Sequence, residues 1–144
     1  MKPRQYDILI LGGGPAGLSA AIAAAESGAT SVALVERKNR WGWPIQCAEL
    51  VPKLIGETVT LERDAIVHSV EGLRFYLEDE QICCLRAPGY VLDRSRFETM
   101  LADRAARLGV SLWQPANAYA ISGQGALVIQ HGCQYELEAK VIIG

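Results

Sequence analysis

The sequence has no excess of charge of one sign and few aromatic residues. Its 14 lysine and arginine residues are balanced by 16 aspartate and glutamate residues, which gives a formal net charge of −2. A protein that attracts nucleic acid by bulk electrostatics needs a clear positive excess. We therefore expect no nucleic-acid partner, and the 50% of hydrophobic residues exclude a disordered chain.

Long apolar runs, paired cysteines and grouped histidines are also missing. Lys2 and Arg4 precede an apolar stretch, but Asp7 and a glycine cluster interrupt it before the roughly 18 residues of a membrane span are reached. The four cysteines form no CxxC pair, and the two histidines have no acidic or cysteine partners at ligand spacing. These absences predict a cytoplasmic protein with free thiols, no metal site and no membrane span, which leaves room for peripheral membrane contact.

Glycine is concentrated at one place, the run GGGPAG at 12–17. The apolar segment 6–11 before it predicts a buried strand, and the alanine-rich segment from about 15 to 27 predicts a helix that Gly28 ends. The segment 31–36, SVALVE, predicts a second buried strand. Together they have the order and the length, about thirty residues, of a βαβ unit.

Within this unit Gly12, Gly14 and Gly17 match the G-x-G-x-x-G pattern. The first glycine permits a tight turn, the second lets a diphosphate approach the backbone, and the third lets the helix pack close to the strand. Pro15 gives up only an N–H without a helical partner, and the amides from Gly14 to Gly17, Ala16 included, meet the diphosphate at the positive end of the helix dipole.

Glu36 ends the second strand and completes the pattern, because an acid about 20 residues after the glycines binds the ribose of a dinucleotide. Its carboxylate can accept hydrogen bonds from both ribose hydroxyls and would repel a 2′-phosphate. The sequence therefore predicts a site for FAD or NAD rather than NADP.

The rest of the chain does not continue as further βαβ units. Alternation at 73–77 and an apolar run at 82–85 predict a hairpin with its turn at 79–80. A helix is predicted at 95–108, with Ser95 and Glu98 as a capping box. A β-meander of short strands is expected to pack against the parallel sheet, and its strands are 110–114, 118–122, 126–130 and 135–138. A further buried strand at 141–143 is expected to complete the parallel sheet.

At this point the chain resembles the FAD-dependent oxidoreductases of the para-hydroxybenzoate hydroxylase type, and most closely their geranylgeranyl reductase-like branch. The resemblance rests on the stretches "YDILILGGGPAGLSAA…VALVE", "WPIQCAE" and "YVLDRSRFETMLADRAARLGV", which together with the meander cover nearly the whole chain. It implies an α/β fold, a Rossmann-like FAD-binding parallel sheet with an added antiparallel β-meander.

The resemblance also implies site residues. Glu36 would bind the adenosine ribose with Arg37 beside it, the loop of Gln46 and Cys47 would lie near the ribityl chain and flavin ring, and Arg94 would contact the FAD. From the residues alone, the alternatives are that Arg94 is a solvated arginine at a helix start and that Cys47 is a small buried hydrophobe. No catalytic residue is assigned. The tryptophans at 41 and 43 either line the site or pack within their loop.

The activity implied is that of an FAD-dependent oxidoreductase acting on an organic, isoprenoid-like substrate, with NADH or NADPH as candidate reductant. An FAD-dependent monooxygenase or halogenase-like enzyme is one alternative, and a non-catalytic nucleotide-binding fragment is another. Residues 1–144 are expected to be the N-terminal FAD-binding part of a two-domain flavoprotein of about 350 to 450 residues. The remainder of the same polypeptide would then complete the flavin pocket, and the 144 residues alone would be inactive.

Overall fold

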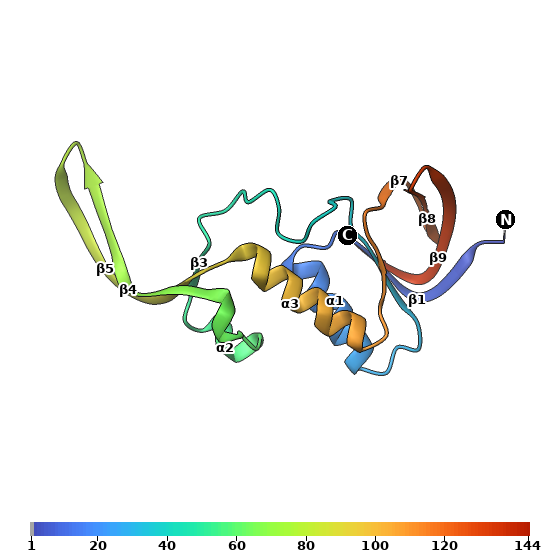
Figure 1. Cartoon of the computed structure of the whole chain (residues 1–144), viewed down its shortest axis with the longest axis horizontal. Coiled ribbons are helices and arrows are strands. Elements are labelled where there is room, and N and C mark those ends of the chain that lie inside the picture. The colour runs from blue at the N-terminus through green and yellow to red at the C-terminus, as the bar shows by residue number, and fades with distance from the viewer. Residues whose placement is uncertain (1) are drawn as a thin grey trace. The chain divides into compact units, whose positions relative to one another are not determined.

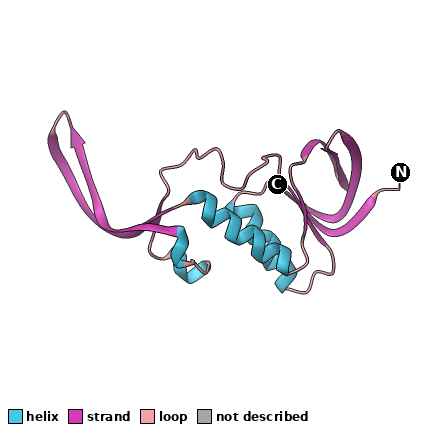
Figure 2. Cartoon of the chain, in the orientation of Figure 1, coloured by secondary structure: helices cyan, strands magenta, loops and turns pink. Residues whose placement is uncertain are grey.

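A computed structural model of the chain describes residues 2–144, which form two compact units. Unit 1 takes the segments up to Trp43 and from Glu98 to Gly144, and unit 2 is Pro44–Phe97. Figures 1 and 2 show that both units combine helices and strands.

Unit 1 is built on one six-stranded sheet with the strand order β6-β2-β1-β9-β8-β7. The first four strands in this order are parallel to one another, whereas β8 is antiparallel to both of its neighbours, β9 and β7. The predicted α/β architecture, a parallel sheet with an added meander, is therefore present. The strands are β1 (Arg4–Leu11), β2 (Val32–Val35), β6 (Ser111–Trp113), β7 (Asn117–Ser122), β8 (Gly125–Gln130) and β9 (Cys133–Ile143).

The βαβ unit forms as the sequence predicts. Helix α1 (Pro15–Glu26) links β1 to β2, and Leu11 at the end of β1 pairs with Val35 at the end of β2. Leu9 belongs to the core shared with the meander, while Ile10 faces α1. Both faces of the two strands are covered, which explains why their sequences are almost continuously apolar.

The meander differs from the prediction in two ways. The assignment of 110–114 to the meander as its first strand is wrong, because this segment forms β6, which pairs in parallel with β2. The strands predicted separately at 135–138 and 141–143 are one strand, β9, whose Leu137 pairs with β8 on one side and with β1 on the other. The meander does pack against the parallel strands, in a core that includes Leu9, Val35, Trp113, Val128 and Leu137.

Helix α3 (Arg94–Arg107) begins one residue before the predicted start, and its predicted capping box is wrong. The Asp93 carboxylate accepts the N–H of Arg96 at 3.0 Å, which makes Asp93 the N-cap in place of Ser95. Glu98 is then in the second turn of the helix, and its carboxylate accepts a hydrogen bond from the N–H of Gly42, 56 positions earlier in the chain. A sequence pattern cannot distinguish these two arrangements, because aspartate and serine cap helices equally well.

Unit 2 holds a three-stranded antiparallel sheet in the order β3-β5-β4. The β4–β5 hairpin is confirmed, with its turn at Glu78 and Asp79, one residue earlier than predicted. Both turn residues have positive φ, 50° and 80°, as the type I′ hairpin turn requires. The remaining elements are a short helix and a 3-10 turn; the bounds are β3 (Leu50–Pro52), α2 (Ile55–Thr58), η1 (Arg63–Ala65), β4 (Ile66–Leu77) and β5 (Glu80–Leu92).

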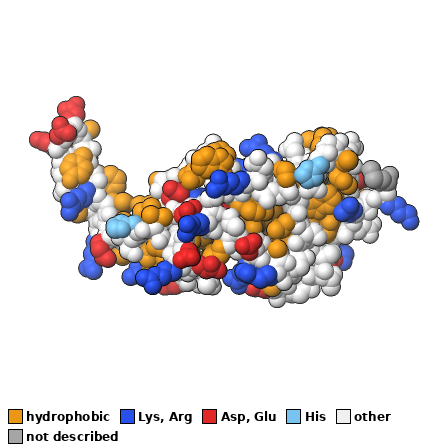
Figure 3. All heavy atoms as spheres, in the orientation of Figure 1, with side chains coloured by type: hydrophobic (Ala, Val, Ile, Leu, Met, Phe, Trp, Pro, Cys, Tyr) orange, Lys and Arg blue, Asp and Glu red, His pale blue; other side chains and the backbone are white. Residues whose placement is uncertain are grey.

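Unit 2 exposes much apolar surface. β3 pairs only with the end of β5, so the outer part of the hairpin has two strands, and hydrophobic side chains line it in Figure 3. Among them, Phe75, Leu77 and Leu85 are 45%, 65% and 49% exposed. At the base of the sheet lies a groove of about 720 Å³, which is mainly apolar and is lined by residues that include Leu50, Val51, Pro52, Leu54, Leu73 and Pro88.

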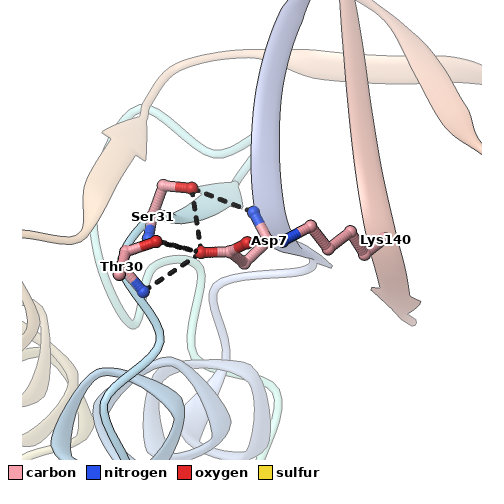
Figure 4. Close-up of polar contacts among 4 residues, drawn as sticks. All are labelled: Asp7, Thr30, Ser31 and Lys140. Carbon is pink, nitrogen blue, oxygen red and sulfur yellow. Dashed lines mark hydrogen bonds and ion pairs between the residues drawn. The ribbon is translucent and has the colours of Figure 1, made fainter.

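The turn between α1 and β2 is fastened to β1 by Asp7, as Figure 4 shows. One carboxylate oxygen of Asp7 accepts hydrogen bonds from the backbone and hydroxyl groups of Thr30 and Ser31, and the other pairs with Lys140 Nζ at 2.6 Å. The Lys140 ammonium and the Thr30 hydroxyl hold the pKa of Asp7 well below its ordinary value of 3.8. The carboxylate thus joins β1, β2 and β9 at the end of the sheet where β1 begins.

This cluster predicts acid sensitivity. A carboxyl group whose pKa is lowered by folding stabilises the native state above its ordinary pKa, and this contribution is lost as the pH falls below about 4. Asp7→Asn should lower the melting temperature at neutral pH and reduce its fall between about pH 5 and about pH 3. Thermal unfolding followed by circular dichroism measures both. The exposed Asp103, changed to Asn, is the control; equal melting curves for Asp7→Asn and wild type would contradict this role.

Candidate dinucleotide site

The glycine-rich loop has the shape that its sequence predicts. Gly12 has φ +113°, a conformation that favours glycine. A Cβ atom at Gly17 would lie 1.9 Å from the carbonyl oxygen of Gly12, so only glycine allows the helix to approach the loop this closely. At Gly14 a Cβ atom would meet nothing within 4 Å, which leaves open space beside the backbone. The conformational reasons for glycine at positions 12 and 17 are confirmed.

The first amides of helix α1 have no backbone acceptor among residues 2–144. Its first helical hydrogen bond runs from the Leu18 N–H to the Gly14 oxygen at 2.9 Å, so the amides of Ala16 and Gly17 have no intrahelical acceptor. Gly14 at the N-cap offers no side chain, and the first turn contains no acidic residue. The positive end of the helix dipole is therefore available to an anion, as in diphosphate sites.

Glu36 lies beside this helix start, and both of its carboxylate oxygens accept hydrogen bonds. Its side chain is buried, and the two carboxylate oxygens accept the N–H groups of Gly13 at 2.6 Å and Lys38 at 2.7 Å. A carboxylate has about four lone-pair sites, so two remain for further donors. The two hydroxyls of a ribose are donors of that kind, and the negative charge disfavours a phosphate on the same sugar.

The middle glycine of the run was not assigned a role from the sequence, yet it is the most crowded of the three. A Cβ atom at Gly13 would lie 2.4 Å from Cζ3 of Trp41 and 2.7 Å from Cβ of Glu36. The signal for this contact was the run of three glycines where the motif needs two. Trp41 therefore packs within the site. Trp43 is 51% exposed, and Cζ of Arg40 lies 5.7 Å from the centroid of its ring.

The remaining predicted residues divide between the two units. Arg37 follows Glu36 in unit 1 and is exposed. Gln46 and Cys47 lie in a loop of unit 2, and both are exposed, so the buried-hydrophobe interpretation of Cys47 is wrong. Arg94 begins helix α3 in the same unit.

Glu49, which the sequence did not single out, joins the loop of Cys47 to the start of α3. Its N–H donates to Cys47 Sγ at 3.4 Å, and its carboxylate accepts the Arg94 N–H at 3.0 Å. Its backbone oxygen accepts the Leu92 N–H at 2.9 Å, and its φ of 60° is unusual for a residue other than glycine. The structure thus brings the loop of Cys47 and the Arg94 backbone together within unit 2.

Comparison with known proteins assigns the family. A sequence model of the FAD-dependent oxidoreductases matches residues 7–143. The chain belongs to this family. The uncapped helix start and the Glu36 carboxylate suit a diphosphate and a ribose, and FAD, the cofactor of this family, contains both groups. The predicted recognition and α/β fold class are confirmed.

Individual relatives point to one branch. The digeranylgeranylglycerophospholipid reductase of Methanosarcina acetivorans is 34% identical over 96% of this chain and 37% of its own length. An uncharacterized protein from the nifH2 5′ region of Methanosarcina barkeri is 34% identical over 97% of this chain and 81% of its own length. The structure of a geranylgeranyl bacteriochlorophyll reductase-like protein of Thermoplasma acidophilum matches with a TM-score of 0.87 and 29% identity, over 98% of this chain and 39% of that one.

The chain spans less than two fifths of the reductase and of the reductase-like protein. Flavin-dependent halogenase and monooxygenase structures match at 22% and 18% identity, which shows a shared fold alone.

Within residues 2–144, no helix is both long and apolar enough to cross a membrane, and no group of three potential metal ligands occurs.

The crowding at Gly13 yields a prediction. Gly13→Ala should lower the free energy of unfolding by about 1–3 kcal/mol, because the methyl group must displace the Trp41 ring and the Glu36 side chain. Urea unfolding measures the change. Gly56→Ala is the matched control, since a Cβ atom there meets nothing within 4 Å. Equal effects of the two substitutions would contradict the packing described here.

Proposed function

We propose that residues 1–144 are the FAD-binding part of a larger flavoprotein that reduces an apolar, isoprenoid-like substrate. The observation that carries the proposal is the pairing of an uncapped helix start with a buried, oriented Glu36 carboxylate. The first suits a diphosphate and the second suits a ribose without a 2′-phosphate. FAD contains both groups, and family membership favours it over NAD.

Different residues of unit 1 would contact different parts of the FAD. The amides from Gly14 to Gly17 hold the diphosphate, with Pro15 and Ala16 in the same helix turn, and Glu36 holds the adenosine ribose with Arg37 beside it. Bound FAD supplies hydride chemistry to the enzyme.

In unit 2, the guanidinium of Arg94 would add a charge-assisted contact to the FAD. The loop of Gln46 and Cys47 would lie near the ribityl chain and the flavin ring. Because Cys47 is exposed, its thiol is accessible for such a contact.

Two observations support an isoprenoid-like substrate. The relatives of known type are named for geranylgeranyl groups. Unit 2 contains an apolar groove of about 720 Å³, and burial of an isoprenoid chain is favoured by apolar surface. NADH or NADPH is the proposed reductant and the cytoplasm the proposed location, with peripheral membrane contact where the substrate is a lipid.

The coverage of the reductase relatives supports a longer polypeptide, in which the later part completes the flavin pocket and covers exposed surface of unit 2. A monooxygenase or halogenase-like activity is the second candidate, favoured by the shared fold. Oxidation of NADH or NADPH by the complete protein, with and without O₂, separates the two. A reduced product formed without O₂ supports the reductase, and a hydroxylated or halogenated product that requires O₂ supports the alternative.

FAD binding at the glycine loop is tested by two substitutions. Gly14→Val should give colourless protein, because a branched side chain fills the space for the diphosphate. Glu36→Ala should weaken FAD binding by about 1–3 kcal/mol, the usual loss for a charge-assisted hydrogen-bonding group. Visible absorbance of the purified proteins and titration with FAD provide the measurements. Gly123→Val, at another glycine with open space, is the control, and normal flavin content in Gly14→Val would show that the site is elsewhere.

A further inference from the structure

Glu98 is a buried carboxylate that the proposed cofactor contacts do not use. Among the residues that the structure describes, Glu36 and Glu98 are the two buried charged side chains, with 8% and 4% exposure. A buried carboxylate is costly unless hydrogen bonds satisfy it. Glu36 has a place in the site, so the position of Glu98 in the second turn of α3 needs a reason of its own.

The carboxylate of Glu98 holds the turn that follows the ribose-binding strand. Its Oε2 accepts the N–H of Gly42 at 2.7 Å in a buried contact between segments 56 positions apart. Gly42 is buried and has φ +67°, and the Trp43 N–H bonds back to the Arg40 oxygen at 3.4 Å. The bond from Glu98 therefore fixes a tight turn at its glycine.

That turn places Trp41 against the site. The Trp41 ring lies so close to Gly13 that a Cβ atom there would be 2.4 Å from it. The N–H of the same Gly13 donates to Glu36 Oε2 at 2.6 Å. A continuous set of contacts thus runs from Glu98 through Gly42 and Trp41 to the peptide that orients Glu36.

We propose that Glu98 is a positioning residue for recognition of the adenosine ribose. By holding Gly42, it keeps Trp41 against Gly13, and Gly13 then keeps the Glu36 carboxylate turned toward the ribose hydroxyls. The proposal rests on the proposed function, since it assumes that Glu36 binds that ribose. It assigns to Glu98 an effect on one part of the ligand, the 2′ and 3′ hydroxyls.

The test compares ADP with 2′,3′-dideoxy-ADP by calorimetry. Wild-type protein should bind ADP about tenfold more tightly than the dideoxy nucleotide, because hydrogen bonds to a carboxylate are among the stronger ones. In Glu98→Ala this preference should fall to about twofold or less, because Glu36 is no longer oriented. A general loss of stability would weaken the binding of both nucleotides equally and leave the ratio of their dissociation constants unchanged. A ratio of about ten in a folded Glu98→Ala protein therefore overturns the proposal.

Three further variants control the result. Glu98→Gln retains an oxygen that can accept the Gly42 N–H and should keep most of the preference for ADP. Trp41→Ala leaves the Glu98 contact in place and should lose the preference, which keeps the test valid if Glu98→Ala does not fold. Asp103→Ala removes an exposed acid from the same helix and should change nothing.

The outcome separates two failures. If wild-type protein binds neither FAD nor ADP, the proposed function is wrong and the role of Glu98 falls with it. If wild type prefers ADP and Trp41→Ala retains the same preference, the cofactor site stands and the positioning role is overturned.

Discussion

The hydrogen bond between the Gly13 N–H and the Glu36 carboxylate is the contact on which the rest of the site depends. A buried carboxylate requires donors, and this one receives a short bond of 2.6 Å from the glycine loop. The bond is possible because β1 and β2 end side by side, with Leu11 paired to Val35. The parallel register of two strands thus decides where the Glu36 carboxylate lies relative to the start of α1.

The βαβ unit is secured at both ends by different means. At the carboxyl ends of the strands, Gly17 lets α1 contact the Gly12 backbone, because any side chain at position 17 would collide with the Gly12 carbonyl oxygen. At the other end, Asp7 gathers Thr30, Ser31 and Lys140 around one carboxylate. The meander is hydrogen-bonded to the same sheet through β9, so the core of unit 1 is enclosed by strands of one continuous sheet.

Where the sequence-based interpretation failed, two local patterns were equally consistent with the residues. Asp93 and Ser95 can both cap a helix, and Glu98 fits a capping box as well as a buried contact. The segment 110–114 is short and apolar, which is typical of a meander strand and of a parallel edge strand alike. Only the pairing of β6 with β2 distinguishes them, and pairing between distant segments has no signature in the periodicity of either.

The sequence by itself determined the βαβ unit, the glycines at 12, 14 and 17 and the acid at 36, because their spacing and local conformational demands specify one arrangement. Tertiary structure decided the contact of Trp41 with Gly13, the partner of Glu98, the bridge made by Glu49 and the double pairing of β9. Apart from the Glu49 N–H contact with Cys47 and the hairpin pairing of β9 with β8, these features join residues about 30 to more than 100 positions apart. Their geometry depends on how the chain packs, which hydrophobic periodicity and turn chemistry do not encode.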